Sequence, residues 1–217
     1  MKLSIINGSP RGASGNTEKL LEHFIKGFTG TAGNSVDTFF AIKHRPDFAK
    51  LKDVFLDAEI LMIAFPLYVD AMPGSVKEFI ESLEGLKGKR PDLRIMFVIQ
   101  NGFPETYQNR FVERYCEKLA KRLGCIYEGS ICKGGCEGLD VQPPALVNKV
   151  FSGFYKVGKS FGEKGALDPE ILKKLAHPKH LTPENMELIV PMVNNFLWDS
   201  RFEKNNALDK KFDKPFE

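Results

Sequence analysis

Two runs of the chain, EILMIAF at 59–65 and LRIMFVI at 93–99, are apolar almost without interruption. Strands have this composition when helices cover both faces of their sheet. Three further apolar runs, Leu3–Asn7, Val36–Ala41 and Cys125–Ile131, read as strands of the same sheet. The chain therefore has to build a sheet that is buried on both sides.

Helical patterns separate these strands along the chain. A helix after the first strand has Leu20, Leu21, Phe24, Ile25 and Phe28 on one face, and further helices are expected at 74–86 and 106–123, with a weaker one at 48–55. Strict alternation of strands and helices predicts an α/β fold with a doubly wound, five-stranded parallel sheet, because right-handed crossovers place helices on both faces. Strand order 2-1-3-4-5 suits five strands, with a crevice at the carboxyl ends of strands one, three and four.

The loop after the first strand reads NGSPRGASGNTEKLL and opens directly into a helix. Its glycines allow backbone turns, so that N–H groups can converge on an anion at the helix N-terminus. Polar side chains of the types that bind phosphate come from Ser9, Arg11, Ser14, Asn16 and Thr17. The loop therefore predicts a phosphate site, although short strand-to-helix turns also carry Gly and Ser for geometry alone.

Two common phosphate loops do not fit this sequence. A P-loop needs Gly-Lys-Ser/Thr at the helix start, where this chain has Gly15-Asn16-Thr17. A dinucleotide loop needs G-x-G-x-x-G and an acid that ends the second strand, and both are missing. A monophosphate held mainly by hydroxyls and amides fits better.

Two more loops follow strands three and four. The first, FPLYVDAMPGSVK from 65, has two prolines that fix the backbone and Tyr68 at the strand end. The second, QNGFPE from 100, offers amides, an exposed glycine backbone and an aromatic ring. Ordinary turns also contain Pro and Tyr, but three ligand-competent loops at strands one, three and four coincide with the expected crevice.

The pairing of NGSPRGASGNTEKLL with FPLYVDAMPGSVKEFIE resembles the NAD(P)H-dependent FMN reductase family of the flavodoxin-like superfamily, over about the first 135 residues. The resemblance implies an FMN phosphate bound by the five polar residues of the first loop. It places the isoalloxazine against Pro66, Leu67, Tyr68 and Val69, and its pyrimidine edge near Asn101, Gly102 and Phe103. The related iron–sulfur flavoproteins carry a cysteine cluster between strands two and three, where this chain has IKHRPDFAKLKD, so we reject a cluster there.

The resemblance implies an FMN-dependent oxidoreductase that takes hydride from NADH or NADPH and reduces a small acceptor such as a quinone or a flavin. No protein residue is assigned a catalytic role, because flavin chemistry needs orientation more than a protein acid or base. The alternative is a flavodoxin-like electron carrier without its own NAD(P)H activity. Such carriers are typically acidic, whereas this chain has a formal charge of +3. A flavodoxin-like domain without flavin is the third reading.

The charge, the cysteines and the histidines indicate which partners, location and metal sites to expect. Basic residues are scattered among acids and no apolar run has the length of a membrane span, so neither nucleic acid nor membrane is expected as a partner. The four cysteines do not form a disulfide framework, which fits a cytoplasmic protein. Their spacing predicts no metal site. Cys132 and Cys136 are expected to be buried or loop-lining thiols, with a redox dithiol beside the flavin as the alternative. The four histidines are expected to face solvent.

The last third of the chain predicts additional helices. We expect one domain over 1–198, with a helical extension from about 143 that includes helices at 169–176 and 183–198, and a charged tail or docking arm at 199–217. Apolar side chains on these helices exceed what is needed to cover the sheet: Phe151, Phe154, Phe161, Phe196 and Leu197. Because related reductases usually form dimers, we predict a homodimer in which these helices complete the pocket of the neighbouring subunit. The alternative is that these side chains pack on their own domain.

Overall fold

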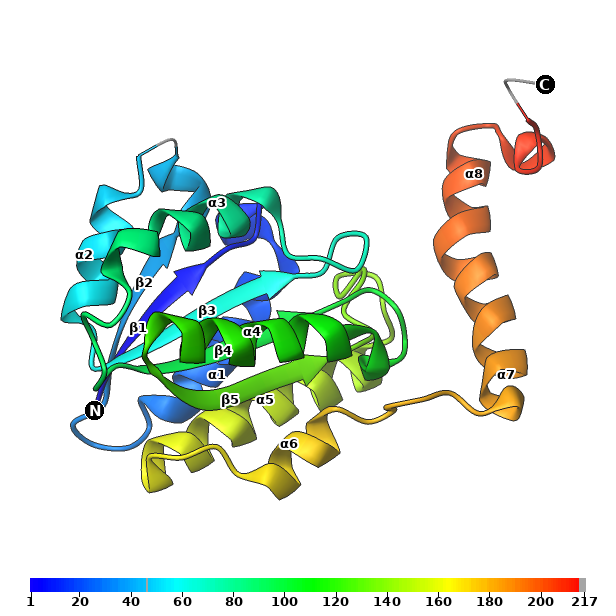
Figure 1. The fold of residues 1–217 in the computed structure, drawn as a ribbon. Helices are drawn as coiled ribbons and strands as arrows, with labels where there is room; N and C mark the ends of the chain where they lie inside the picture. Colours follow the sequence, from blue (N-terminus) through cyan, green and yellow to red (C-terminus); the bar gives the residue numbers. More distant parts are fainter. Residues whose placement is uncertain (46, 215–217) are drawn as a thin grey trace. The chain divides into compact units, whose positions relative to one another are not determined.

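The computed structural model describes residues 1–45 and 47–214, without the side chains of residues 196 and 197. The chain divides into two compact units, Met1–Lys179 and His180–Glu217. The first unit is a sheet between two layers of helices (Figure 1). From the sequence we predict a first domain that ends at residue 198 and therefore includes the helix that follows His180. That boundary stays a prediction.

The sheet of the first unit has five strands, all paired in parallel, in the order β2-β1-β3-β4-β5. The strands are β1 (Lys2–Asn7), β2 (Ser35–Phe40), β3 (Ile60–Pro66), β4 (Arg94–Gln100) and β5 (Ile126–Lys133). The predicted strand order is confirmed, and most strand ends lie within one residue of the prediction. β5 continues two residues further than predicted, to Lys133, which pairs with Gln100 at the end of β4.

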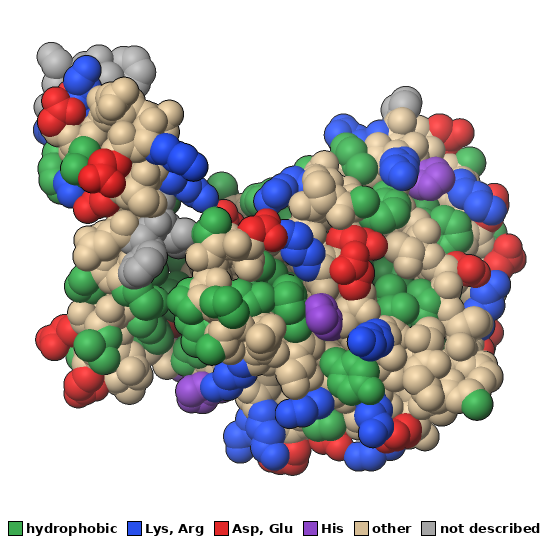
Figure 2. Space-filling model, turned by 180° about the vertical axis from the view of Figure 1, so that it is seen from behind, with side chains coloured by type: hydrophobic (Ala, Val, Ile, Leu, Met, Phe, Trp, Pro, Cys, Tyr) green, Lys and Arg blue, Asp and Glu red, His purple; other side chains and the backbone are tan. Residues whose placement is uncertain are grey.

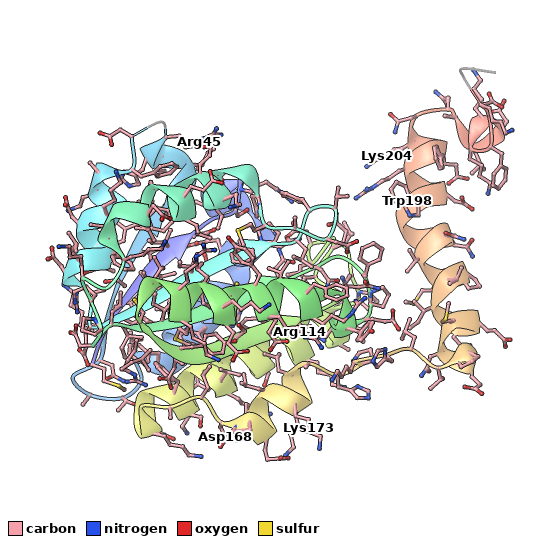
Figure 3. The ribbon with its side chains drawn as sticks, viewed as in Figure 1. Arg45, Arg114, Asp168, Lys173, Trp198 and Lys204 are labelled. Carbon is pink, nitrogen blue, oxygen red and sulfur yellow. The ribbon has the colours of Figure 1, made fainter. Side chains whose placement is uncertain are left out.

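Helices cover both faces of the sheet. One face packs against α2 (Ala49–Asp57), α3 (Gly74–Ser82) and α4 (Arg110–Leu123), and the other against α1 (Asn16–Phe28), α5 (Pro144–Lys164) and α6 (Pro169–Leu175). Two predicted helices are shorter than expected, because α3 gives way to a 3₁₀ turn at Glu84–Leu86 and the segment before α4 is a 3₁₀ turn at Thr106–Asn109. Asp168, labelled in Figure 3, is the N-cap of α6, and its carboxylate accepts from the backbone N–H groups of Glu170 and Ile171.

The extension helix α5 belongs to the core of the first unit. Phe154 and Phe161 are fully buried, and Phe161 packs against two phenylalanines of α1. The two helix backbones meet at Gly27 and Gly158: a Cβ added at Gly158 would lie 2.0 Å from the Phe24 carbonyl oxygen. These rings therefore pack on their own domain, and they provide no free surface for a second subunit.

The second unit is a run of helical segments: α7 (Pro183–Val193), a π-helical turn (Asn194–Asp199), α8 (Ser200–Lys204) and a 3₁₀ turn (Leu208–Lys210). The helix predicted to reach Trp198 therefore loses α-helical geometry after Val193. No residue of α7 is buried, and Met186, Leu188, Val190 and Met192 are exposed. The side chains of Phe196 and Leu197, which entered the dimer prediction, lie outside the described residues.

Charged side chains are mixed on the surface. The face shown in Figure 2 carries both Lys and Arg and Asp and Glu side chains, with no large area of a single charge. Several described ion pairs join exposed partners, for example Lys2 with Asp37 and Lys77 with Glu81. Among the described residues, no helix is both long and apolar enough to span a bilayer.

Candidate functional site

A polar pocket lies at the carboxyl ends of β1, β3 and β4, where the strand order places a crevice. Eight of the twelve predicted site residues line it: Ser9, Arg11, Asn16, Pro66, Leu67, Tyr68, Asn101 and Gly102. Two residues that were not predicted, Gln100 and Glu137, complete the lining. Ser14, Thr17, Val69 and Phe103 are not part of it.

The loop after β1 is held by its own hydrogen bonds. The buried Asn7 accepts from the Ser9 N–H at 2.9 Å, and its amide donates to the Glu18 carboxylate at 2.7 Å. The Arg11 N–H donates to Ser9 Oγ at 3.3 Å, and the Gly12 N–H to the Ser9 carbonyl at 2.9 Å. Burial raises the pKa of Glu18 despite the hydrogen bond from Asn7. These contacts fix the shape of the loop before any ligand arrives.

The N-terminus of α1 opens at this pocket without a capping side chain. Gly15 is the N-cap, so the first N–H groups of the helix have no acceptor within it. A Cβ at Gly15 would lie 2.6 Å from Ser9 Oγ, so a larger residue would collide with that hydroxyl. The exposed Arg11 lies on the same loop. Free N–H groups, a hydroxyl and a guanidinium together make a site for an anion.

Three of the predicted phosphate ligands are already engaged within the protein. Ser14 Oγ donates to the Arg11 carbonyl at 2.9 Å, and the Asn16 amide donates to the Cys136 carbonyl at 2.7 Å. Thr17 is fully buried and its hydroxyl accepts from Gln100 Nε2 at 3.3 Å. Their side chains position the loop and the start of α1.

The loop after β3 forms a tight and strained turn. The backbone groups of Tyr68 and Ala71 exchange hydrogen bonds of 2.8 and 3.1 Å, and the Leu67 N–H donates to the Gln100 carbonyl. Val69 and Asp70 between them have φ values of 49° and 60°. A β-branched residue in this region is strained. The Val69 side chain is 98% exposed, so no packing within the described chain compensates for the strain.

The loop after β4 places a buried amide in the lining of the pocket. Asn101 is 2% exposed, and its Nδ2 donates to Asn109 Oδ1 at 2.9 Å, which fixes the orientation of the amide. Asn109 is held in turn by the Ile99 carbonyl. Asn101 Oδ1 has no hydrogen-bond partner among the described residues. A buried acceptor without a partner is costly, so a donor on a ligand would satisfy it.

The loop after β5 closes the fourth side of the pocket. The Gly135 N–H donates to the Phe103 carbonyl at 2.6 Å, and the Cys136 N–H donates to the Asn101 carbonyl at 2.9 Å. Glu137 lies over Gly102, where an added Cβ would be 3.1 Å from the Glu137 Cβ. Gln100 could have been predicted, because it is the polar residue at the end of the apolar run of β4. No local sequence pattern pointed to Glu137.

The thiols near the pocket are not reactive. Cys136 is fully buried, and burial raises its pKa to about 12. Burial also raises the pKa of Cys132 well above its ordinary value, and both cysteines are free thiols. At neutral pH they stay protonated, which disfavours a redox dithiol. The described residues contain no group of three or more side chains suited to hold a metal ion.

One histidine makes a ring contact within the protein. His23 stacks on the Phe151 ring of α5, with ring centroids 4.2 Å apart. Burial lowers the pKa of His23 from its ordinary value. The stacking ring lies far along the sequence, on the extension helix, so no local pattern indicated this contact. His23 is remote from the pocket lining and serves the packing of α1 on α5.

A family model matches residues 1–143 of this chain, and it describes a flavodoxin-like fold. The match spans more than half of the sequence, so the chain belongs to this family. A search of curated protein sequences gives no match.

Solved structures with the same fold include several reductases. A putative quinone reductase from Klebsiella pneumoniae has a TM-score of 0.60 at 13% identity, over 85% of this chain and 95% of its own. RosB with bound 8-demethyl-8-formylriboflavin-5'-phosphate has a TM-score of 0.58 at 15% identity, over 90% of this chain and 87% of its own. An FMN-dependent NADH-azoreductase from Bacillus anthracis in complex with FMN has a TM-score of 0.51 at 12% identity, over 75% of this chain and 100% of its own. At these identities the likeness concerns the fold.

Proposed function

We propose that this protein is an FMN-dependent oxidoreductase that takes hydride from NADH or NADPH and reduces a small acceptor, such as a quinone or a flavin. The observation that carries the proposal is the pocket at the carboxyl ends of β1, β3 and β4. It combines an anion site at the start of α1 with an unpartnered buried acceptor at Asn101. Reductases and flavin proteins among the structural neighbours support the same class.

The residues present fit the phosphate of FMN. The free N–H groups at the start of α1, the Ser9 hydroxyl and the Arg11 guanidinium are donors, as a dianion requires. Gly15 lets the loop pass close to Ser9, because a Cβ at this position would collide with the Ser9 hydroxyl. Asn7 and Asn16 support the site by holding the loop in place.

The flavin ring would lie between the loops after β3 and β4. Tyr68 and Leu67 offer a flat, partly apolar wall, and Asn101 Oδ1 offers an acceptor for a ring N–H group. FMN supplies hydride acceptance and electron transfer when it is bound. The protein's part is to bind the phosphate, orient the ring and shape access to it, and no side chain of the pocket is assigned as a proton donor.

A flavodoxin-like electron carrier is the second candidate. The fold and the pocket would serve it equally well, but the formal charge of +3 differs from the acidic surface that helps a carrier dock to a basic partner. The charge therefore favours the enzyme. Four free thiols support a cytoplasmic location.

A homodimer is proposed from the second unit. The unit from His180 is short for a stable core, and no residue of α7 is buried, so its apolar side chains need a partner surface. We propose that a second copy of the chain provides it. In sedimentation at micromolar concentration the full chain should be a dimer, and a chain that ends at Lys179 a monomer. A monomeric full chain would contradict the proposal.

The visible spectrum of the protein and anaerobic reduction of its bound flavin test the proposed enzyme activity. The purified protein, reconstituted with FMN and freed of excess, should show bound flavin, and NADPH or NADH should bleach it in a stopped-flow experiment. A flavin that dithionite reduces and neither nucleotide touches would indicate the carrier. A protein that retains no flavin would refute both.

A further inference from the structure

An arginine is clamped between two aromatic rings at the start of α4. The Arg110 guanidinium lies 3.8 Å from the centroid of the Tyr107 ring and 4.0 Å from that of Phe111. One of its N–H groups donates to the Tyr107 carbonyl at 3.2 Å. Among the described residues, no carboxylate forms an ion pair with Arg110. The rings therefore hold a planar cation whose remaining donors are uncommitted.

This cluster is joined to the candidate site. Asn109 directly precedes Arg110, and its side chain bonds to Asn101 in the pocket and to the Ile99 carbonyl of β4. The Tyr107 N–H donates to the Lys179 carbonyl at 3.1 Å. The start of α4 is thus fixed relative to the loop that ends β4. The cluster therefore follows directly, along the chain, on a residue that is bonded to the pocket lining.

The surroundings of Arg110 favour an anionic ligand with an aromatic group. Phe111 is 58% exposed, so one ring of the clamp is available for stacking. Arg114, labelled in Figure 3, follows one turn later, is exposed and forms no ion pair among the described residues. Glu113 is the one acid between the two arginines, and burial raises its pKa. The positive charge of the two guanidinium groups therefore predominates.

We infer that Arg110, Arg114 and the Phe111 ring bind the adenosine 2'-phosphate end of NADPH, which makes NADPH the preferred reductant. The inference rests on the proposed reductase function. A guanidinium offers two parallel N–H groups to a phosphate, and an exposed ring stacks on a purine. NADH has no 2'-phosphate and loses the contact with the arginines. The geometry thereby selects between the two nucleotides that the sequence left open.

Direct binding of nucleotide fragments to the full chain tests the site without any flavin chemistry. By calorimetry, 2'-AMP should bind at least about tenfold more tightly than adenosine, because one charge-assisted contact to phosphate has this magnitude. Arg110→Gln should remove the difference, and Arg110→Lys should restore part of it. Arg122→Gln, on the last turn of the same helix, is the matched control and should leave binding unchanged. Equal binding of the two fragments would overturn the inference.

Steady-state kinetics give a second readout. Arg110→Gln should raise the KM for NADPH by about tenfold and leave the KM for NADH unchanged. A variant that raises both equally, with an unchanged melting temperature, would show that Arg110 does not read the 2'-phosphate. A chain that binds 2'-AMP through Arg110 but whose flavin NADPH does not reduce would support this site and contradict the proposed reductase activity.

Discussion

Gly158→Ala should destabilise the first unit strongly, because it places a methyl group where α1 and α5 meet backbone to backbone. The new Cβ would lie 2.0 Å from the Phe24 carbonyl oxygen and 2.8 Å from its carbonyl carbon, where ordinary contacts begin at 3.4 Å. A backbone carbonyl cannot rotate away as a side chain can. The two helices therefore have to separate by more than 1 Å at this position.

The cost follows from the packing around this contact. Overpacking in a core costs about 1–3 kcal/mol, and separation also loosens Phe161 against Phe24 and Phe28. The gain in helix propensity from Gly to Ala returns about 1 kcal/mol. We expect a net loss of about 2 kcal/mol in the free energy of unfolding, which lowers the melting temperature by about 4–8 °C for a chain of this length.

Gly153→Ala is the matched control on the same helix. Its Cβ would meet the end of the Leu175 side chain at 2.7 Å, and this side chain can change rotamer. The free energy of unfolding should change by less than about 1 kcal/mol, since the gain in helix propensity offsets a small rearrangement. Urea unfolding followed by far-UV circular dichroism measures both variants. Equal stability of the two would refute the close approach of α1 and α5.

Two further predictions concern strain and pH. Val69→Gly should raise the melting temperature by about 2–4 °C, because it relieves a positive φ at an exposed side chain, and a decrease measured by calorimetry would show that the turn is not strained. His23 has a pKa lowered by burial, so its contribution to stability is present above its unfolded pKa and is lost as the pH falls through about 6.5. His23→Gln should flatten the decline in stability between about pH 7 and 5 in urea titrations, and an unchanged slope would contradict the burial of His23.

The sheet could be predicted because its signal is local. Each strand is a short apolar run, and the rule for parallel crossovers leaves few orders for five of them. The helix ends were less predictable. Apolar spacing continues through the 3₁₀ turns at Glu84–Leu86 and Thr106–Asn109, so that periodicity alone could not place the start of α4 or the end of α3.

The pocket was predictable where it comes from strand ends and unpredictable where distant segments meet. The loops after β1, β3 and β4 are recognisable by their glycines, prolines and amides. Glu137 reaches the pocket because the Cys136 N–H bonds to Asn101, a pairing between loops that no sequence spacing reveals. For the same reason the sequence could not indicate that the Asn16 amide is engaged by Cys136.

The affinity ratio between FMN and riboflavin tests the central claim most directly. Fluorescence titration of the flavin-free protein should give at least about a 100-fold preference for FMN, because two or more charge-assisted hydrogen bonds to the phosphate contribute about 3 kcal/mol together. Ser9→Ala should reduce this ratio about tenfold and leave riboflavin affinity unchanged, since Ser9 lies at the phosphate end of the pocket. Equal affinity for FMN and riboflavin would contradict a phosphate site at the start of α1.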